Sequence, residues 1–253
     1  MNTALASLLA HPAIWHGDAC APEPATLPSG YAALDAALPG RGWPQGALTE
    51  MLLEREGIGE LRLTLPALVH VQAQGRDVVW IAPPYRPYAP ALAAAGLDLA
   101  RFYIVRVRDA QDALWAYEQA LRAPDCGAAF AWHGVRDERL LRRLQVAARD
   151  GRTWGVLWRR PGHAGGALAA PLRLGLSAAD GGHRLAVRVL KRRGAELSQP
   201  IVVDCNAAAH SSMASSPSLP ASLPMMPPSH PATPVSLRSA RALSTLRRAP
   251  ATH

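Results

Sequence analysis

The stretch GALTEMLLEREGIGELRLTLPALVHVQAQGRDVVWIA, residues 46–82, decides the fold of this 253-residue chain. It opens with an apolar, β-rich run at 47–53, continues as a helical stretch at 61–73 and ends in a second apolar run at 77–82. Two short buried strands joined by a helix form a βαβ unit, whose right-handed crossover makes the strands parallel. The stretch therefore predicts an α/β architecture built on a parallel sheet.

The same alternation of strands and helices continues beyond this unit. The further predicted strands are residues 102–107, 127–132 and 153–158, and the further predicted helices are residues 88–96, 110–122 and 135–149. After residue 170 the pattern changes to strands without helices at 172–178, 184–191 and 200–203. We therefore expect a mainly parallel, twisted sheet flanked by helices, with an antiparallel extension of the same sheet at its C-terminal side.

Composition divides the chain into three parts. Residues 1–27 form an N-terminal segment, residues 28–205 the α/β domain, and residues 206–253 a tail rich in Ala, Ser and Pro. Such a tail buries too little apolar surface to offset its ordering entropy, so we expect it to be largely disordered. Within it, VSLRSARALSTLRR at 235–248 fits two interpretations, a solvated tail or a helix that folds on a partner. The arginines of that segment are Arg238, Arg241, Arg247 and Arg248.

Charge and cysteine content narrow the functional classes. The net charge is +8, which suits either nucleic acid or an acidic protein surface and does not choose between them. Three widely spaced cysteines, Cys20, Cys126 and Cys205, fit buried thiols in a reducing cytoplasm better than disulfides or a zinc site. No run of eighteen apolar residues occurs and the N-terminus lacks a basic leader, so we expect a cytoplasmic protein without a membrane segment.

The residues that lead into the first strand resemble the RecA recombinase family. Ser29 fits the cap of a short helix, and Gly42-Trp43-Pro44-Gln45-Gly46 fits the turn that precedes the first core strand in that family. The resemblance implies a RecA-like core, in which this strand enters a phosphate-binding loop. Such a loop needs two glycines, a lysine and a hydroxyl in the spacing G-x-x-x-x-G-K-[ST].

The eight residues at that place, 54–61, no longer fit a phosphate. Glu54 stands at the first glycine, Glu60 at the lysine and Leu61 at the magnesium-binding hydroxyl. Gly59 keeps its place, while Gly57 lies at a variable position. A carboxylate at the lysine position sets like charge against phosphate. We therefore expect no nucleotide cofactor and no enzymatic ATP hydrolysis.

Two other ATPase positions are replaced as well. The resemblance puts the catalytic glutamate after the second strand, where the chain has Pro83 and Pro84. It puts the acidic residue that ends the strand on the side of the metal ion near Trp132 or His133. These two side chains fit either new binding chemistry or ordinary packing, and packing is the preferred interpretation. The nine histidines are scattered singly, which predicts neither a metal centre nor a catalytic triad.

The residues around the loop show a second resemblance, which is more specific than the one to RecA. Residues 50–53 (EMLL) and 57–63 (GIGELRL) look like the ImuA family, as do the opening HPAIWHG and the stretch WIAPPYRPYAPALAAAGLDL. The resemblance covers about residues 1–205. It implies a cassette protein of SOS-induced mutagenic translesion synthesis, nucleoid-associated when DNA is damaged. Its implied partners are the polymerase-like protein ImuB and, indirectly, an error-prone replicative-type polymerase subunit.

Three hypotheses follow, and the first is a non-catalytic adaptor that recruits or regulates the error-prone polymerase complex. The second is a modulator of RecA filaments, because 3–15 occupies the place of the subunit-exchange element in RecA relatives. The third hypothesis, an ATPase with rerouted chemistry, would require tight binding of Mg-ATP. Besides these three hypotheses, a SulA-like division inhibitor is an alternative, since those proteins share a remote kinship with this fold.

Several basic residues are candidate contacts for a partner or for DNA. They are Arg159 and Arg160 at a strand end, and Lys191, Arg192 and Arg193 at the end of another. The first pair fits a solvated edge or a residual DNA contact, and Lys191 and Arg193 match lysines that reach a neighbouring subunit's ATP in the RecA pattern. The arginines of the helix at 135–149 are interpreted as a solvated face.

Overall fold

The computed structural model describes residues 25–132, 135, 137–160, 170–179, 183–192 and 199–206. By its internal contacts the chain divides into two units, 1–215 and 216–253, and all of the described residues belong to the first. The N-terminal segment before residue 25 and the tail after residue 206 lie outside the described residues. The predicted domain boundaries, the disorder of the tail and the role of 235–248 therefore stay predictions.

A mixed, mostly parallel sheet of eight strands forms the centre of the fold, as the alternation of strands and helices predicted. The strand order is β10-β9-β8-β3-β7-β6-β4-β5. The strands are β3 (Leu48–Leu53), β4 (Asp77–Ile81), β5 (Phe102–Val105), β6 (Cys126–Ala131), β7 (Trp154–Arg159), β8 (Leu172–Ala178), β9 (Arg184–Lys191) and β10 (Ile201–Asp204). A separate antiparallel pair, β1 (Thr26–Leu27) with β2 (Trp43–Pro44), precedes β3.

The direction of β8 corrects the expected antiparallel extension. β8 lies beside β3 and runs parallel to it, whereas β9 pairs antiparallel with both β8 and β10. The prediction of an antiparallel extension is thus right for β9 and β10 and wrong for β8. The connection from β7 to β8, residues 160–171, has about the dozen residues that a parallel crossover needs.

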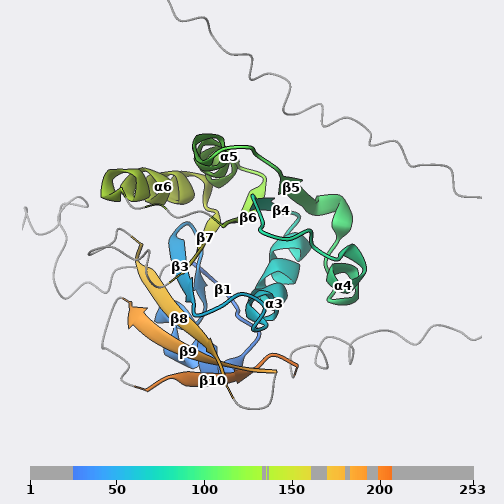
Figure 1. The fold of residues 1–253 in the computed structure, drawn as a ribbon, viewed down its shortest axis with the longest axis vertical. Coiled ribbons are helices and arrows are strands. Elements are labelled where there is room, and N and C mark those ends of the chain that lie inside the picture. Colours follow the sequence, from blue (N-terminus) through green and yellow to red (C-terminus); the bar gives the residue numbers. More distant parts are fainter. Residues whose placement is uncertain are drawn as a thin grey trace, which may run out of the picture. The chain divides into compact units, whose positions relative to one another are not determined.

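Helices cover both faces of the sheet, so the architecture is α/β (Figure 1). On one face, α2 (Ala32–Ala37) and α3 (Glu60–Ala73) pack against the sheet, and on the other α5 (Ala110–Arg122) and α6 (Glu138–Gly151). The short helix α4 (Ala89–Ala94) and the 3₁₀ turns Pro39–Arg41 and Leu99–Arg101 complete the elements. In the part of the chain that the structure describes, no helix is long and apolar enough to cross a membrane.

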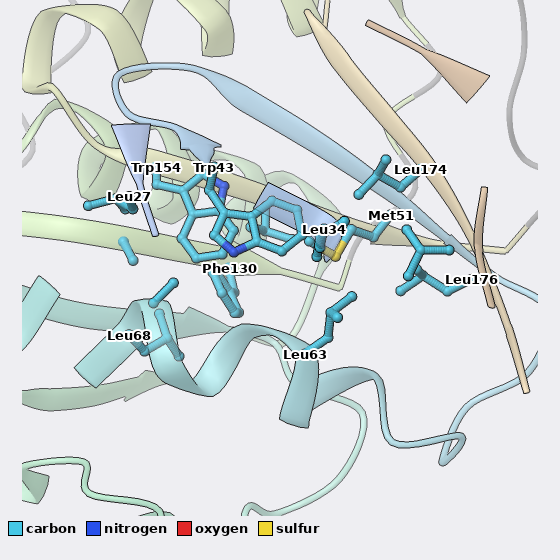
Figure 2. Packing of buried hydrophobic residues seen from close by; sticks show 14 of the residues in the cluster. Leu27, Leu34, Trp43, Met51, Leu63, Leu68, Phe130, Trp154, Leu174 and Leu176 are labelled. Carbon is cyan, nitrogen blue, oxygen red and sulfur yellow. The ribbon is translucent and has the colours of Figure 1, made fainter. Parts of the chain in front are cut away.

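Alternate side chains of the strands supply two apolar cores. On β3, Met51 and Leu53 join the core under α3, while Leu48 joins the core under α5 and α6. Figure 2 shows Leu63 and Leu68 of α3 facing the sheet residues of the first core. Because successive side chains of a strand point to opposite faces, a strand buried on both sides reads as a continuous apolar run.

Two helix starts differ from the sequence-based expectation. The last helix begins at Glu138 and not at residue 135, because the Asp137 carboxylate accepts a hydrogen bond from the Arg139 N–H at 2.8 Å and caps it. Ser29 is not the cap of α2, since the cap residue is Tyr31. The Ser29 hydroxyl instead accepts from the N–H of Tyr31, the cap residue two positions later, at 3.1 Å.

A substitution at Gly151, at the end of α6, tests how closely α6 packs against α5. A methyl group at Gly151 would overlap the backbone carbonyl oxygen of Leu121 at the end of α5. Gly151→Ala should therefore lower the free energy of unfolding by about 1–3 kcal/mol, the usual range for overpacking. Urea unfolding followed by tryptophan fluorescence measures this change.

Gly175→Ala in β8 is the matched control. The nearest atom to a methyl group there is a Leu190 side-chain carbon at 3.5 Å, an ordinary contact. Its free energy of unfolding should stay within about 0.5 kcal/mol of the wild-type value. Equal stability of the two variants would show that α5 and α6 do not approach each other as closely as described.

Candidate functional site

The degenerate phosphate loop, defined as residues 54–61, keeps the backbone course of a strand–loop–helix turn. It joins β3 to α3, as the sequence predicted. Gly57 and Gly59 have φ angles of +79° and +96°, in the left-handed region that favours glycine. Gly59 is also the residue that caps α3. The loop thus has left-handed glycines at two positions, and α3 begins directly after the second of them.

Glu60 places a carboxylate inside this turn. The residue is only 8% exposed, and its Oε1 accepts a hydrogen bond from the Gly57 N–H at 3.2 Å. In a phosphate loop, backbone N–H groups at this place bind the phosphate oxygens. Here one of those N–H groups is already used by an anion that belongs to the chain itself. The same anion repels a second negative charge.

Apolar side chains pack under the loop. Ile58 belongs to the core on the α3 side and is 8% exposed. At the carboxyl ends of β6 and β7, the rings of Trp132 and Trp158 stack with centroids 6.0 Å apart and planes 17° from parallel. Trp132 also makes edge contacts with Trp80 and Phe130. The packing interpretation of Trp132 is therefore confirmed, while His133 lies outside the described residues.

Glu56, at the outer rim of the loop, contacts both Arg160 and Tyr85, a tyrosine in the connection between β4 and α4. The Arg160 guanidinium pairs with Glu56 at 3.3 Å, and the Arg160 side chain is 70% exposed. A hydrogen bond to the same Glu56 raises the pKa of Tyr85, which follows Pro83 and Pro84 after β4. Arg160, a candidate contact residue, thus lies beside the degenerate loop.

Arg159, predicted together with Arg160, has a different place. Its side chain is 0% exposed and its Nη1 lies 3.1 Å from Glu50, whose side chain is also 0% exposed. Arg173 of β8 approaches the other oxygen of Glu50 at 3.4 Å. The expected surface contact at Arg159 is therefore wrong, because the guanidinium neutralises a buried acid. We call Glu50, Arg159 and Arg173 the buried charge cluster.

Sequence reasoning missed this cluster, although one signal for it is present. Glu50 stands in the middle of the apolar run at 47–53, in a strand that the topology buries. A fully buried carboxylate is rare unless a cation pairs with it. The basic residues of the neighbouring strands could therefore have been sought as its partners.

Two ionisable groups in the core under α5 and α6 are kept neutral by burial. Burial raises the pKa of the Tyr117 phenol well above its usual value, and the charges of Cys126 and Glu50 add to the shift. Burial also raises the pKa of the Cys126 thiol to about 12, against an opposing effect of Arg76. Cys126 and Cys205 are buried free thiols, as predicted, and a protonated thiol is a poor nucleophile.

The remaining candidate contacts are only partly described. Lys191 is exposed at the end of β9, and the Arg192 Nη1 donates to the Ala37 carbonyl oxygen at 2.5 Å, tying this strand end to α2. The contact roles of Arg160, Lys191 and Arg192 stay predictions. The candidates that lie outside the described residues are Arg193, Arg238, Arg241, Arg247 and Arg248.

Removing the Arg159 charge should destabilise the fold strongly. In Arg159→Met, Glu50 would keep only Arg173 as a partner, and breaking a buried pair on one side costs about 3–5 kcal/mol. The free energy of unfolding in urea measures the loss, and Arg159→Lys, which keeps a positive charge, should lose less.

Arg142→Met is the matched control, because Arg142 pairs with Glu138 at 2.7 Å on the surface of α6. An exposed pair of this kind contributes about 0–1 kcal/mol. If Arg159→Met and Arg142→Met were equally stable, Arg159 and Glu50 would not form a buried pair.

Known proteins support the resemblance that the sequence indicated. The chain is 34% identical over 148 residues to Protein ImuA of two Caulobacter vibrioides strains, NA1000 / CB15N and ATCC 19089 / CB 15, which is 55% of this chain and 61% of each relative. It is also 34% identical over 114 residues to the cell division inhibitor SulA of Edwardsiella piscicida, 44% of this chain and 66% of that protein. No protein-family model matches the chain. The matched region spans about three fifths of the ImuA proteins, and over that region this chain is ImuA/SulA-like in sequence.

Proposed function

We propose that this chain is a non-catalytic adaptor of SOS-induced translesion DNA synthesis with a degenerate RecA-like core. It recruits or regulates an error-prone polymerase complex through an ImuB-like protein. The similarity to ImuA supports the pathway. The observation that carries the absence of catalysis is the hydrogen bond from the Gly57 N–H to the Glu60 carboxylate.

Electrostatics at the loop argues against a bound triphosphate. The lysine that would neutralise the β- and γ-phosphates is replaced by Glu60, which is largely buried and fixed by its hydrogen bond to Gly57. A triphosphate would have to displace that carboxylate and then lie against it. Since like charges repel most strongly where water is excluded, both steps are unfavourable.

Packing under the loop argues in the same direction. Trp132 stands where the resemblance puts the acid that serves the metal, and it stacks on Trp158. An indole offers one N–H donor and no oxygen ligand, whereas Mg²⁺ requires oxygen ligands. Ile58 of the loop and Trp158 belong to the same apolar core, and Trp132 packs against that core.

The rim of the loop suits a protein partner. Tyr85 and Tyr88 are 71% and 72% exposed on the connection between β4 and α4. Tyrosine and arginine are enriched at the centres of protein interfaces, and Arg160 lies on the same rim through its pair with Glu56. A core that retains its folded shape without the nucleotide can present this rim continuously.

Nucleotide binding is the direct test of this proposal. Titration calorimetry of the full chain with Mg-ATP should show no binding tighter than about 1 mM. Tryptophan fluorescence should also stay constant, because Trp158 lies across from Met51 in the strand that enters the loop, and Trp132 stacks on Trp158. A micromolar dissociation constant, or ATP turnover above the buffer rate, would contradict the non-catalytic assignment.

Function in the cell is tested by complementation. In a Caulobacter vibrioides strain that lacks its ImuA, expression of this chain should raise the mutation frequency after ultraviolet damage towards the wild-type level. The Glu60→Gln variant, which keeps the size of the side chain, should complement equally well if nucleotide hydrolysis has no role. Failure of the wild-type chain alongside full rescue by the strain's own ImuA would count against the adaptor.

The similarity to SulA supports division inhibition as a second candidate function. The same strains distinguish the two. An adaptor changes mutation frequency at constant cell length, whereas a division inhibitor produces long undivided cells on overexpression without raising mutation frequency.

A further inference from the structure

One face of the C-terminal strands is left without a covering helix among the described residues. The inward side chains of β8, β9 and β10 enter the core on the α3 side, for example Leu174, Val187 and Val203. The alternate side chains point to the face that carries α5 and α6 elsewhere in the sheet. Those two helices pack over the strands from β3 to β4, and neither contributes to the layer over β9 or β10.

Aliphatic side chains on this uncovered face are exposed to solvent. Leu190 of β9 is 47% exposed and Val202 of β10 is 54% exposed. Ala186 lies opposite both Ser177 and Val202 across the three strands. Further along β9 on the same face come Arg188, opposite Gly175, and then Leu190, whose side chain lies over Gly175. We call this set of residues the open face (Gly175, Ser177, Ala186, Arg188, Leu190 and Val202).

The charges around the open face are mainly positive. Arg188, opposite Gly175, is exposed and forms no ion pair within the described ranges. Arg184 lies 4.0 Å from Asp204 at the far end of the same face, so that pair is neutral. Arg173 belongs to the buried charge cluster, in which two guanidinium groups share one carboxylate. The open face therefore presents an unbalanced positive charge beside aliphatic groups.

We propose that the open face docks an acidic, aliphatic segment of a partner protein. This inference rests on the proposed adaptor function and assigns it a surface in addition to the rim of the loop. The partner's carboxylates would pair with Arg188, and its aliphatic side chains would cover Leu190 and Val202. Nucleic acid fits less well, because phosphates gain nothing from two half-exposed aliphatic side chains.

Two other occupants fit the charge less well. The chain's own residues 207–253 carry four arginines and no acid, so they would be repelled by Arg188. A second copy of this chain has a net charge of +8, which opposes self-association on a positive face. An acidic partner has the complementary sign, and charge complementarity of this kind speeds and orients docking.

A random peptide library displayed on phage and selected on the full wild-type chain tests this proposal without a known partner. The enriched peptides should be acidic and contain Leu, Ile or Val. A fluorescently labelled copy of the most enriched peptide is then titrated with purified variants by anisotropy. Arg188→Glu and the double variant Leu190→Ser/Val202→Ser should each weaken binding by about tenfold or more, and added salt should weaken it for the wild type.

Matched controls lie on α6. Arg142→Glu reverses the charge of an exposed arginine, and Val146→Ser removes an aliphatic side chain that is 44% exposed. Both should bind the peptide as the wild type does, and circular dichroism melting should show all variants folded. Duplex DNA of equal charge should bind no better to the wild type than to Arg188→Glu.

Four outcomes would overturn the proposal. They are enrichment of basic peptides, peptide affinity unchanged in both open-face variants, stronger DNA binding that depends on Arg188, or a wild-type dimer in sedimentation that dissociates in the double variant. These readouts do not depend on mutagenesis in cells. A failure of complementation with a positive peptide result would remove the translesion role and leave the docking surface in place.

Discussion

Glu50 is the constraint on which the arrangement of the sheet depends. Its carboxylate is fully buried in the strand between β7 and β8, and each neighbour supplies one arginine to it. An uncompensated buried charge costs several kcal/mol, so the chain reaches its stable state only when both flanking strands are in register. Arg173 therefore helps to fix β8 beside β3, and through β8 the position of β9 and β10.

The loop at residues 54–61 supplies its own anion to a turn that contains two left-handed glycines. In a nucleotide-binding loop the glycines allow amide groups to surround a phosphate, which satisfies those amides. Here Gly57 and Gly59 keep their left-handed backbone, and the Glu60 carboxylate satisfies the Gly57 amide instead. Ile58, a residue of the loop, packs into the apolar core on the α3 side. The chain thus supplies both an anion and apolar atoms at the loop, and our proposal that it binds no nucleotide rests on this.

Local patterns made most of the elements predictable from the sequence. The bounds of α5, β8 and β9 agree with the periodicity of their side chains, which depends on neighbours a few residues away. The direction of β8 and the burial of Arg159 depend instead on a pairing with β3 more than a hundred residues earlier. At the candidate site, the altered loop was readable from residue types, whereas the stack of Trp132 on Trp158 required the sheet register.

Many arginines bind groups of the chain itself, and this changes what the net charge implies about partners. A net charge of +8 suggests attraction to nucleic acid, yet many guanidinium groups are already engaged. Arg76 donates to four backbone carbonyl oxygens, and Glu118 binds both Arg122 and Arg143. Since a guanidinium that is held by carbonyl or carboxylate oxygens has fewer donors left for phosphate, the total charge overstates the surface's affinity for DNA. In our proposal, a partner is selected by the few arginines that lie beside exposed apolar side chains, a placement that suits a protein better than nucleic acid.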